Sequence, residues 1–173
     1  MVKRVKGFIA RARETTEQDD ICLGLEEIAY ILMDVKGKPH EIIFHLQILH
    51  GLRIAEALGL RWEDVDLERD ELKITSQVSE VPKYKLEGTK WAEQTGPVIT
   101  TPKTARSRRT VPLQLGTKAL LEETPFEERH GYIYSTARGT PVLQSNYRRR
   151  VFNPLKKRLG LDTMMTHDLR KFF

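Results

Sequence analysis

The sequence has 173 residues, of which 39% are hydrophobic and 31% charged, enough for one domain with a hydrophobic core. Its net charge is +5, and its single cysteine excludes an intrachain disulfide and a zinc site built on cysteine pairs. No apolar run approaches the roughly 20 residues that span a bilayer, and the first residues lack the apolar stretch of a signal peptide. These features favour a cytoplasmic protein, and the basic balance permits a nucleic-acid partner.

Residues 1–20 are predicted to form a linker or basic arm. The stretch is polar, opening with basic residues and turning acidic before residue 21. Such composition is typical of a solvated segment outside the core. We therefore expect the folded domain over residues 21–173.

Apolar residues at helical spacing predict helices over residues 25–32 and 41–50, with Gly37 ending the first. A third, short helix follows Arg53 and is expected to close at Gly59 in a left-handed turn. His40, His45 and His50 recur every five residues, about 140° apart on a helix. They share no helix face, so we expect no metal site there and interpret His50 as a residue that packs in the core or supports the neighbouring Arg53.

The apolar pattern then changes to alternation, which predicts a strand over Glu71–Val81. Pro97–Thr101 and Arg109–Leu113 are predicted as two more strands that flank a hairpin-like connection. Residues 83–96 are polar and are expected to form an irregular loop. The sequence thus predicts an α+β fold with a small three-stranded antiparallel sheet inserted among helices.

Three further helical segments are predicted towards the carboxyl end. The first covers Gly116–Glu123. The second runs from Asn146 towards Leu159, with Ser145 as its cap and an interruption at Pro154. The last covers His167–Phe173, with Thr166 as its cap.

Arg53 stands at the start of its helix, where the helix dipole disfavours a cation. One interpretation is an ordinary solvated arginine. The other is that Arg53 and the positive helix end together face an external anion, most simply a phosphate.

Residues 103–109 carry four positive charges and no acid. A two-stranded basic finger of this kind could enter a groove and contact phosphates. The alternative is a solvated hairpin tip.

His167 and Arg170 lie three residues apart and share a helix face. Arginine grips phosphate oxygens with two donors, and histidine moves a proton near neutral pH. An incidental surface pair is the alternative. Two basic runs precede them, at residues 148–150 and 156–158, and part of these is expected to be ordinary surface.

Three separated boxes resemble the tyrosine recombinases, or phage-type integrases. The first runs from Gly51 to Asp66, the second from Lys103 to Leu113, and the third from His167 to Arg170. The resemblance implies the mainly helical catalytic domain of DNA breaking-rejoining enzymes. It also implies site-specific recombination and DNA integration through a 3′-phosphotyrosyl intermediate, without a metal or another cofactor.

The resemblance implies a role for each catalytic residue. Arg53 and Arg170 would clamp the phosphate, and His167 would exchange a proton with the attacking hydroxyl. Lys103 would protonate the leaving 5′ oxygen, with Lys85 and Lys90 as weaker alternatives for that role. DNA contacts would come from Arg106, Arg108, Arg109, Arg148, Arg149, Lys85 and Lys90. The implied partners are double-stranded DNA, at the nucleoid of a bacterial host cell, and further protomers, since full recombinases of this type act as tetramers.

The sequence departs from the family at its last residues. The family's nucleophilic tyrosine lies beyond the third box, whereas this sequence stops at Phe173 and its five tyrosines all precede that box. We therefore expect DNA binding without cleavage. The alternatives are a non-catalytic, regulatory DNA-binding remnant, a type IB topoisomerase-like enzyme, and a basic interaction module without a nucleic-acid role.

Overall fold

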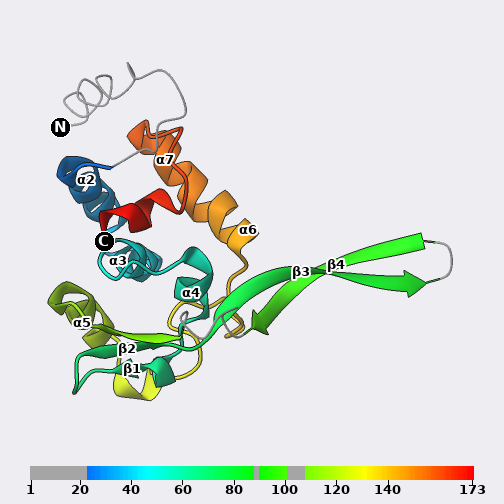
Figure 1. The fold of residues 1–173 in the computed structure, drawn as a ribbon, viewed down its shortest axis with the longest axis horizontal. Helices are drawn as coiled ribbons and strands as arrows, with labels where there is room; N and C mark the ends of the chain where they lie inside the picture. The colour runs from blue at the N-terminus through cyan, green and yellow to red at the C-terminus, as the bar shows by residue number, and fades with distance from the viewer. Residues whose placement is uncertain (1–22, 88–89, 101–107) are drawn as a thin grey trace.

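The computed structural model describes residues 23–87, 90–100 and 108–173, so the predicted arm over residues 1–20 lies outside it. Helices gather into a body with a small sheet at one side, and a long two-stranded hairpin projects from that body (Figure 1). The predicted α+β class is confirmed. None of the helices within these ranges is long and apolar enough to cross a membrane.

Helices α2 (Leu25–Val35), α3 (Glu41–Ile48) and α4 (Ile54–Gly59) confirm the three predicted helices of the first half. Helix α3 is buried on nearly every side, which suits its position at the centre of the body. Gly37 follows α2 with a φ of +71°, as expected for the residue that ends a helix.

Gly59 ends α4 for a different reason than predicted. Its φ is not positive, so the expected left-handed turn is wrong. A Cβ atom at this position would lie 3.0 Å from the Cα atom of Gln77, in the first residue of a neighbouring strand. Glycine is therefore required by the close approach of that strand to α4.

The three-stranded antiparallel sheet is present with the order β1-β2-β5. Its strands are β1 (Val65–Asp66), β2 (Glu71–Ile74) and β5 (Arg109–Pro112). Leu72, Ile74 and Val111 point into the core from this sheet. A 3-10 turn over Trp62–Asp64 leads into β1.

The projecting hairpin corrects three predictions. Strands β3 (Gln77–Glu87) and β4 (Lys90–Thr100) pair along their whole length, so the expected loop over residues 83–96 is wrong. The predicted strand over residues 71–81 is two strands, β2 and the start of β3. Residues 97–100 pair with β3, and β5 pairs with β2 instead. Strands that face a core carry apolar alternation, and residues 83–96 lack that signal.

Helix α5 (Leu115–Glu122) and a 3-10 turn over Phe126–Glu128 follow the sheet. Helix α6 (Gln144–Tyr147), a π-helical turn over Arg148–Phe152 and α7 (Asn153–Leu159) then form one continuous stretch (Figure 1). The stretch begins two residues earlier than predicted, with Leu143 rather than Ser145 as its N-cap. Pro154 lies in the first turn of α7, where its missing N–H is tolerated after the widened π turn.

The last element is a 3-10 turn over Asp168–Phe172, with His167 rather than Thr166 at its N-cap. Asp168 is buried, and its carboxylate accepts the backbone N–H of Met165 at 2.7 Å. Lys171 Nζ lies 3.0 Å from the same carboxylate. This buried acid, not Thr166, fixes the conformation of the turn.

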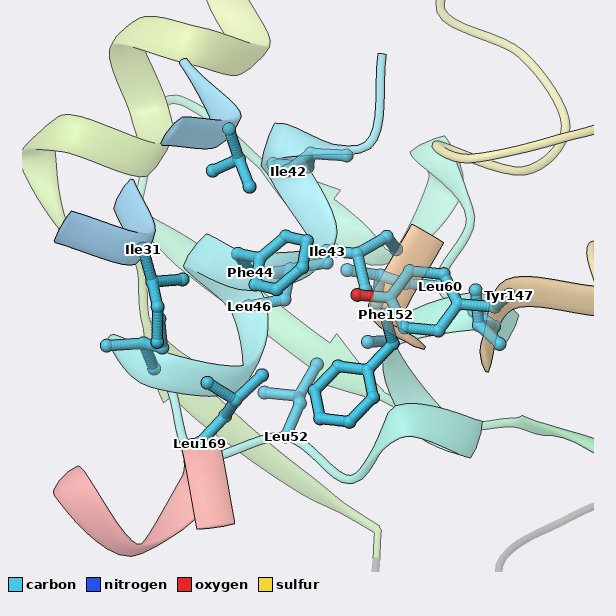
Figure 2. Close-up of a cluster of buried hydrophobic side chains, with 14 of the residues drawn as sticks. Ile31, Ile42, Ile43, Phe44, Leu46, Leu52, Leu60, Tyr147, Phe152 and Leu169 are labelled. Carbon is cyan, nitrogen blue, oxygen red and sulfur yellow. The ribbon is translucent and has the colours of Figure 1, made fainter. Parts of the chain in front are cut away.

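The hydrophobic core joins both halves of the chain. Figure 2 shows Phe44 and Leu46 of α3 with Tyr147 and Phe152 of the carboxyl-terminal helices, and Leu169 of the last turn nearby. The Phe44 and Tyr147 ring centroids are 6.2 Å apart. Because Leu169 is completely buried, its two neighbours in the 3-10 turn, Asp168 and Arg170, are anchored to the body.

Candidate functional site

Glu56 is a buried carboxylate, 1% exposed, in the first turn of α4. One of its oxygens accepts the backbone N–H of Arg53 at 2.9 Å, which is how an acidic side chain in a first turn stabilises a helix start. Its other oxygen accepts Nη1 of the Arg53 side chain at 3.0 Å. Glu56 therefore holds both the backbone and the guanidinium of Arg53.

Arg109, at the start of β5, binds the same carboxylate with two nitrogens. The distances are 3.1 Å from Nη1 to Oε1 and 3.0 Å from Nη2 to Oε2. This fork-like geometry is the strongest form of an arginine–carboxylate contact. It fastens the three-stranded sheet to the start of α4.

Arg170 completes a cluster of three arginines around Glu56. Burial and the nearby positive charges of Arg53 and Arg109 lower the pKa of Arg170, while the charge of Glu56 opposes this shift. Burial alone would raise the pKa of Glu56, but hydrogen bonds from Arg109 and Arg53 outweigh it and lower that pKa. Three guanidinium groups and one ionised carboxylate leave this cluster with net positive charge.

A pocket of about 280 Å³ opens beside the cluster, lined by Gln47, Leu52, Arg53, Ile54, Ala55, Gln144, Thr166, His167 and Arg170. Arg53 and His167 keep 53% and 65% of their side chains exposed, so both reach solvent. The structure thus brings Arg53, His167 and Arg170, three of the four predicted catalytic residues, to one opening. Arg53 is paired with the Glu56 carboxylate, but this ion pair leaves the Arg53 guanidinium accessible to solvent and to the pocket.

Two contacts hold the His167 side of the pocket. Gln47 of α3 is buried and donates from Nε2 to the carbonyl oxygen of Thr166 at 2.9 Å. His167 Nε2 lies 3.3 Å from the carboxylate of Asp168. Gly51, two residues before Arg53, has a φ of +61°, and a Cβ atom there would lie 2.7 Å from the Phe173 ring, so glycine permits the close approach of the last residue.

The model of the phage integrase family matches residues 23–173. The chain belongs to the phage integrase family. It is 28% identical over 160 residues to a tyrosine recombinase XerC-like protein of Caldanaerobacter subterraneus subsp. tengcongensis, covering 84% of this chain. The chain spans about 40% of the length of that relative.

Solved structures share this fold. The Tn1549 transposon integrase in complex with circular intermediate DNA has a TM-score of 0.68 and 19% identity, covering 95% of this chain and 56% of that one. XerA recombinase has a TM-score of 0.60 and 16% identity, covering 99% of this chain and 58% of that one. The predicted fold, that of a recombinase catalytic domain, is confirmed.

The predicted basic contacts are distributed unevenly. Arg108, Arg148 and Arg149 are exposed, and Gln144, which accepts a hydrogen bond from Arg148 at 3.5 Å, also lines the pocket. Lys85 and Lys90 lie in β3 and β4, in the projecting hairpin. Lys103 and Arg106 lie outside the described residues.

Arg109 has a different environment from the one predicted. The sequence placed it at the base of a basic finger, as a DNA contact or a hairpin residue. It starts β5, is 26% exposed and forms the fork-like pair with Glu56. Arg158, in the second basic run, likewise binds Asp34 of α2 and lowers the pKa of that acid to about 2.

Sequence reasoning missed Glu56, Arg109 as its partner, and Gln47. The spacing of Glu56 three residues after Arg53 was a usable signal, because such pairs meet on a helix. The contacts of Arg109 with Glu56 and of Gln47 with Thr166 join residues far apart along the chain, so no local sequence pattern predicts them.

Proposed function

We propose that this chain is the DNA-binding catalytic domain of a site-specific tyrosine recombinase and that its pocket takes one DNA phosphate. The observation that carries this proposal is the arrangement of Arg53, His167 and Arg170 around one opening beside a net positive cluster. The family match favours a recombinase over a topoisomerase-like enzyme. It also supports a domain over residues 21–173.

In this proposal the two arginines bind the non-bridging oxygens of a phosphodiester. A guanidinium offers paired donors that fit two phosphate oxygens, and its fixed charge stabilises the negative charge that builds up in the transition state. His167 exchanges a proton with the attacking hydroxyl, and Lys103 delivers a proton to the leaving 5′ oxygen. The described residues that line the pocket include no tyrosine, so the proposal gives these residues phosphate binding and proton transfer and assigns the attacking hydroxyl to none of them.

The surrounding surface extends the proposed DNA contact. Arg148 and Arg149 are exposed in the π turn, where Arg148 donates a hydrogen bond to Gln144 and Arg149 donates one to Asn146. We assign them, with Arg106, Arg108, Lys85 and Lys90, to neighbouring phosphates of double-stranded DNA. Full-length relatives would act on DNA as tetramers, in the bacterial cytoplasm at the nucleoid.

A binding titration tests the proposal. The anisotropy of a labelled DNA duplex should rise with protein, and the affinity should fall steeply with added salt because released counterions drive such binding. Arg53→Ala and Arg170→Ala should each weaken binding by about tenfold and lower the salt slope by about one. Arg69→Ala, at a solvent-exposed position that does not line the pocket, is the matched control.

The proposal is contradicted if the DNA affinity does not change with salt concentration, or if neither Arg53→Ala nor Arg170→Ala lowers it. Retention of DNA by the Arg69→Ala protein at wild-type strength is required for the comparison to hold.

A further inference from the structure

The strongest contact at the site does not come from a residue that lines the pocket. Arg109 donates two hydrogen bonds to Glu56, whereas the Arg53 side chain donates one. Arg109 is also the more buried of the two arginines, at 26% against 53% exposure of the side chains. Arg109 therefore provides the larger share of the side-chain hydrogen bonds to the buried carboxylate, beside the backbone N–H of Arg53.

Arg109 and Arg53 have different roles at Glu56: Arg109 binds both carboxylate oxygens, and Arg53 binds one of them and faces the pocket. A buried carboxylate is costly unless donors satisfy both of its oxygens. Arg109 reaches both oxygens, so the Arg53 guanidinium needs only Nη1 for Glu56. The remaining Arg53 donors can then serve a ligand in the pocket.

We propose that Arg109 is a positioning residue of this site: its fork fixes the Glu56 carboxylate, and Glu56 in turn fixes the Arg53 guanidinium at the pocket. The inference rests on the proposed function, because it gives Arg53 a phosphate to bind. Arg109 acts through Glu56 and contacts no DNA in this arrangement.

The proposal requires the shape of arginine as well as its charge. Lysine at position 109 retains the positive charge but offers a single ammonium, which cannot reproduce a fork on two oxygens. Arg109→Lys therefore separates positioning from simple charge balance. Arg69→Lys, on a side chain that is 78% exposed, is the matched control.

A double-mutant cycle provides the first test, on the whole chain with a labelled DNA duplex. Arg109→Lys should weaken binding about fivefold, and in the Arg53→Ala background it should add less than about twofold, because residues that act through one another are not additive. A merely structural role would weaken both backgrounds equally. Wild-type affinity of Arg109→Lys, or full additivity with Arg53→Ala, overturns the proposal.

Titration of the Glu56 carboxyl carbon by NMR provides a test that needs no DNA. Glu56 faces Arg53 at its own helix start, Arg109 from β5 and Arg170 from the last turn. Arg109→Gln should raise the Glu56 pKa because burial then dominates, while Arg69→Gln should leave it unchanged. An unchanged Glu56 pKa in Arg109→Gln also overturns the proposal.

The two measurements separate the possible failures. If the wild-type chain fails to bind DNA, the proposed function falls. The titration then decides whether Arg109 holds Glu56. If the Glu56 pKa is the same in Arg109→Gln as in the wild type, that contact is rejected whatever the DNA result. If Arg109→Gln does not fold, Arg109→Lys in the same titration takes its place.

Discussion

Gln47 and Thr166 are joined by a hydrogen bond of 2.9 Å across 119 positions of the sequence. The amide nitrogen of Gln47, in α3, donates to the carbonyl oxygen just before His167. The other amide atom, Oε1, is buried and has no hydrogen-bond partner within the part of the chain that the structure describes. One buried side chain thus links the central helix to the segment that carries His167 and Arg170.

Gln47→Leu should loosen this link. The Thr166 carbonyl loses its donor, which costs about 1 kcal/mol of unfolding free energy. The backbone amides of Asp168 and Arg170, which donate within the last turn, should exchange faster with solvent. Hydrogen exchange followed by NMR measures this. Gln114→Ala, at an exposed position, should change neither quantity, and equal exchange in both variants would reject the link.

Replacing Gly59 by alanine should lower the free energy of unfolding, whereas replacing Gly116 by alanine should raise it. Gly59→Ala places a Cβ atom 3.0 Å from the Gln77 backbone, so α4 and β3 must separate, at a cost of about 1–3 kcal/mol. Gly116→Ala, in α5, meets no atom within 4 Å and should stabilise the helix by about 0.5–1 kcal/mol. Denaturant unfolding midpoints compare them. A harmless Gly59→Ala would contradict the close approach.

His50 should make the fold sensitive to acid. Burial lowers its pKa from 6.5 to about 4, opposed by its contact with the Pro112 carbonyl and aided by the charge of His45. Because the folded-state pKa is depressed, the unfolded chain takes up the proton first as pH falls. Stability worth about 3 kcal/mol should therefore be present above pH 6.5 and lost between pH 6.5 and 4.

His50→Gln provides the comparison for this effect. Unfolding free energy measured at several pH values should fall less steeply with acid in the variant than in the wild type. His40 and His45 also have lowered pKa values, so only the difference between the two slopes belongs to His50. Parallel slopes would assign the acid sensitivity to the other histidines.

Tyr147→Phe should leave the protein equally stable or more stable. The Tyr147 ring packs in the core, while its hydroxyl is buried without a hydrogen-bond partner among the described residues. Removing an unpaired buried hydroxyl relieves a penalty of about 1 kcal/mol. Phe152→Ala, in the same core, should instead cost about 3–5 kcal/mol. A large loss in Tyr147→Phe would indicate a hydrogen bond to that hydroxyl.

Secondary structure was predicted correctly where buried residues recur at regular spacing in the sequence. Helices α2 and α3 bury apolar residues at helical spacing, and His50 is buried, as its interpretation as a packing residue predicted. His50 nevertheless contacts the same Thr117 hydroxyl as His45, which the helical phase of the histidines did not predict, because α3 ends at Ile48. The hairpin β3–β4 leaves no such trace, because backbone pairing sets its register without apolar alternation.

The candidate site likewise has a part that the sequence predicted and a part that it did not. The meeting of Arg53 with His167 and Arg170 followed from the family resemblance, since no periodicity links positions so far apart. The fork from Arg109 to Glu56 depends on how β5 lies against α4, and Gly59 depends on how closely β3 approaches. Contacts of this kind are set by tertiary packing, so neither propensity nor motif spacing reveals them.

The π-helical turn over Arg148–Phe152 also determines the rotational phase of α7. An α-helix advances about 100° per residue, so the additional residue in this turn sets which way every later side chain points. With it, Tyr147 and Phe152 both reach the interior although they are five positions apart, and Leu155 follows them. A regular α-helix over the same residues would rotate Leu155 out of the interior and swing Arg158 away from Asp34. Deleting Arg149 should instead regularise the helix with Leu155 still facing the interior, because the deletion removes the residue that the widened turn absorbs.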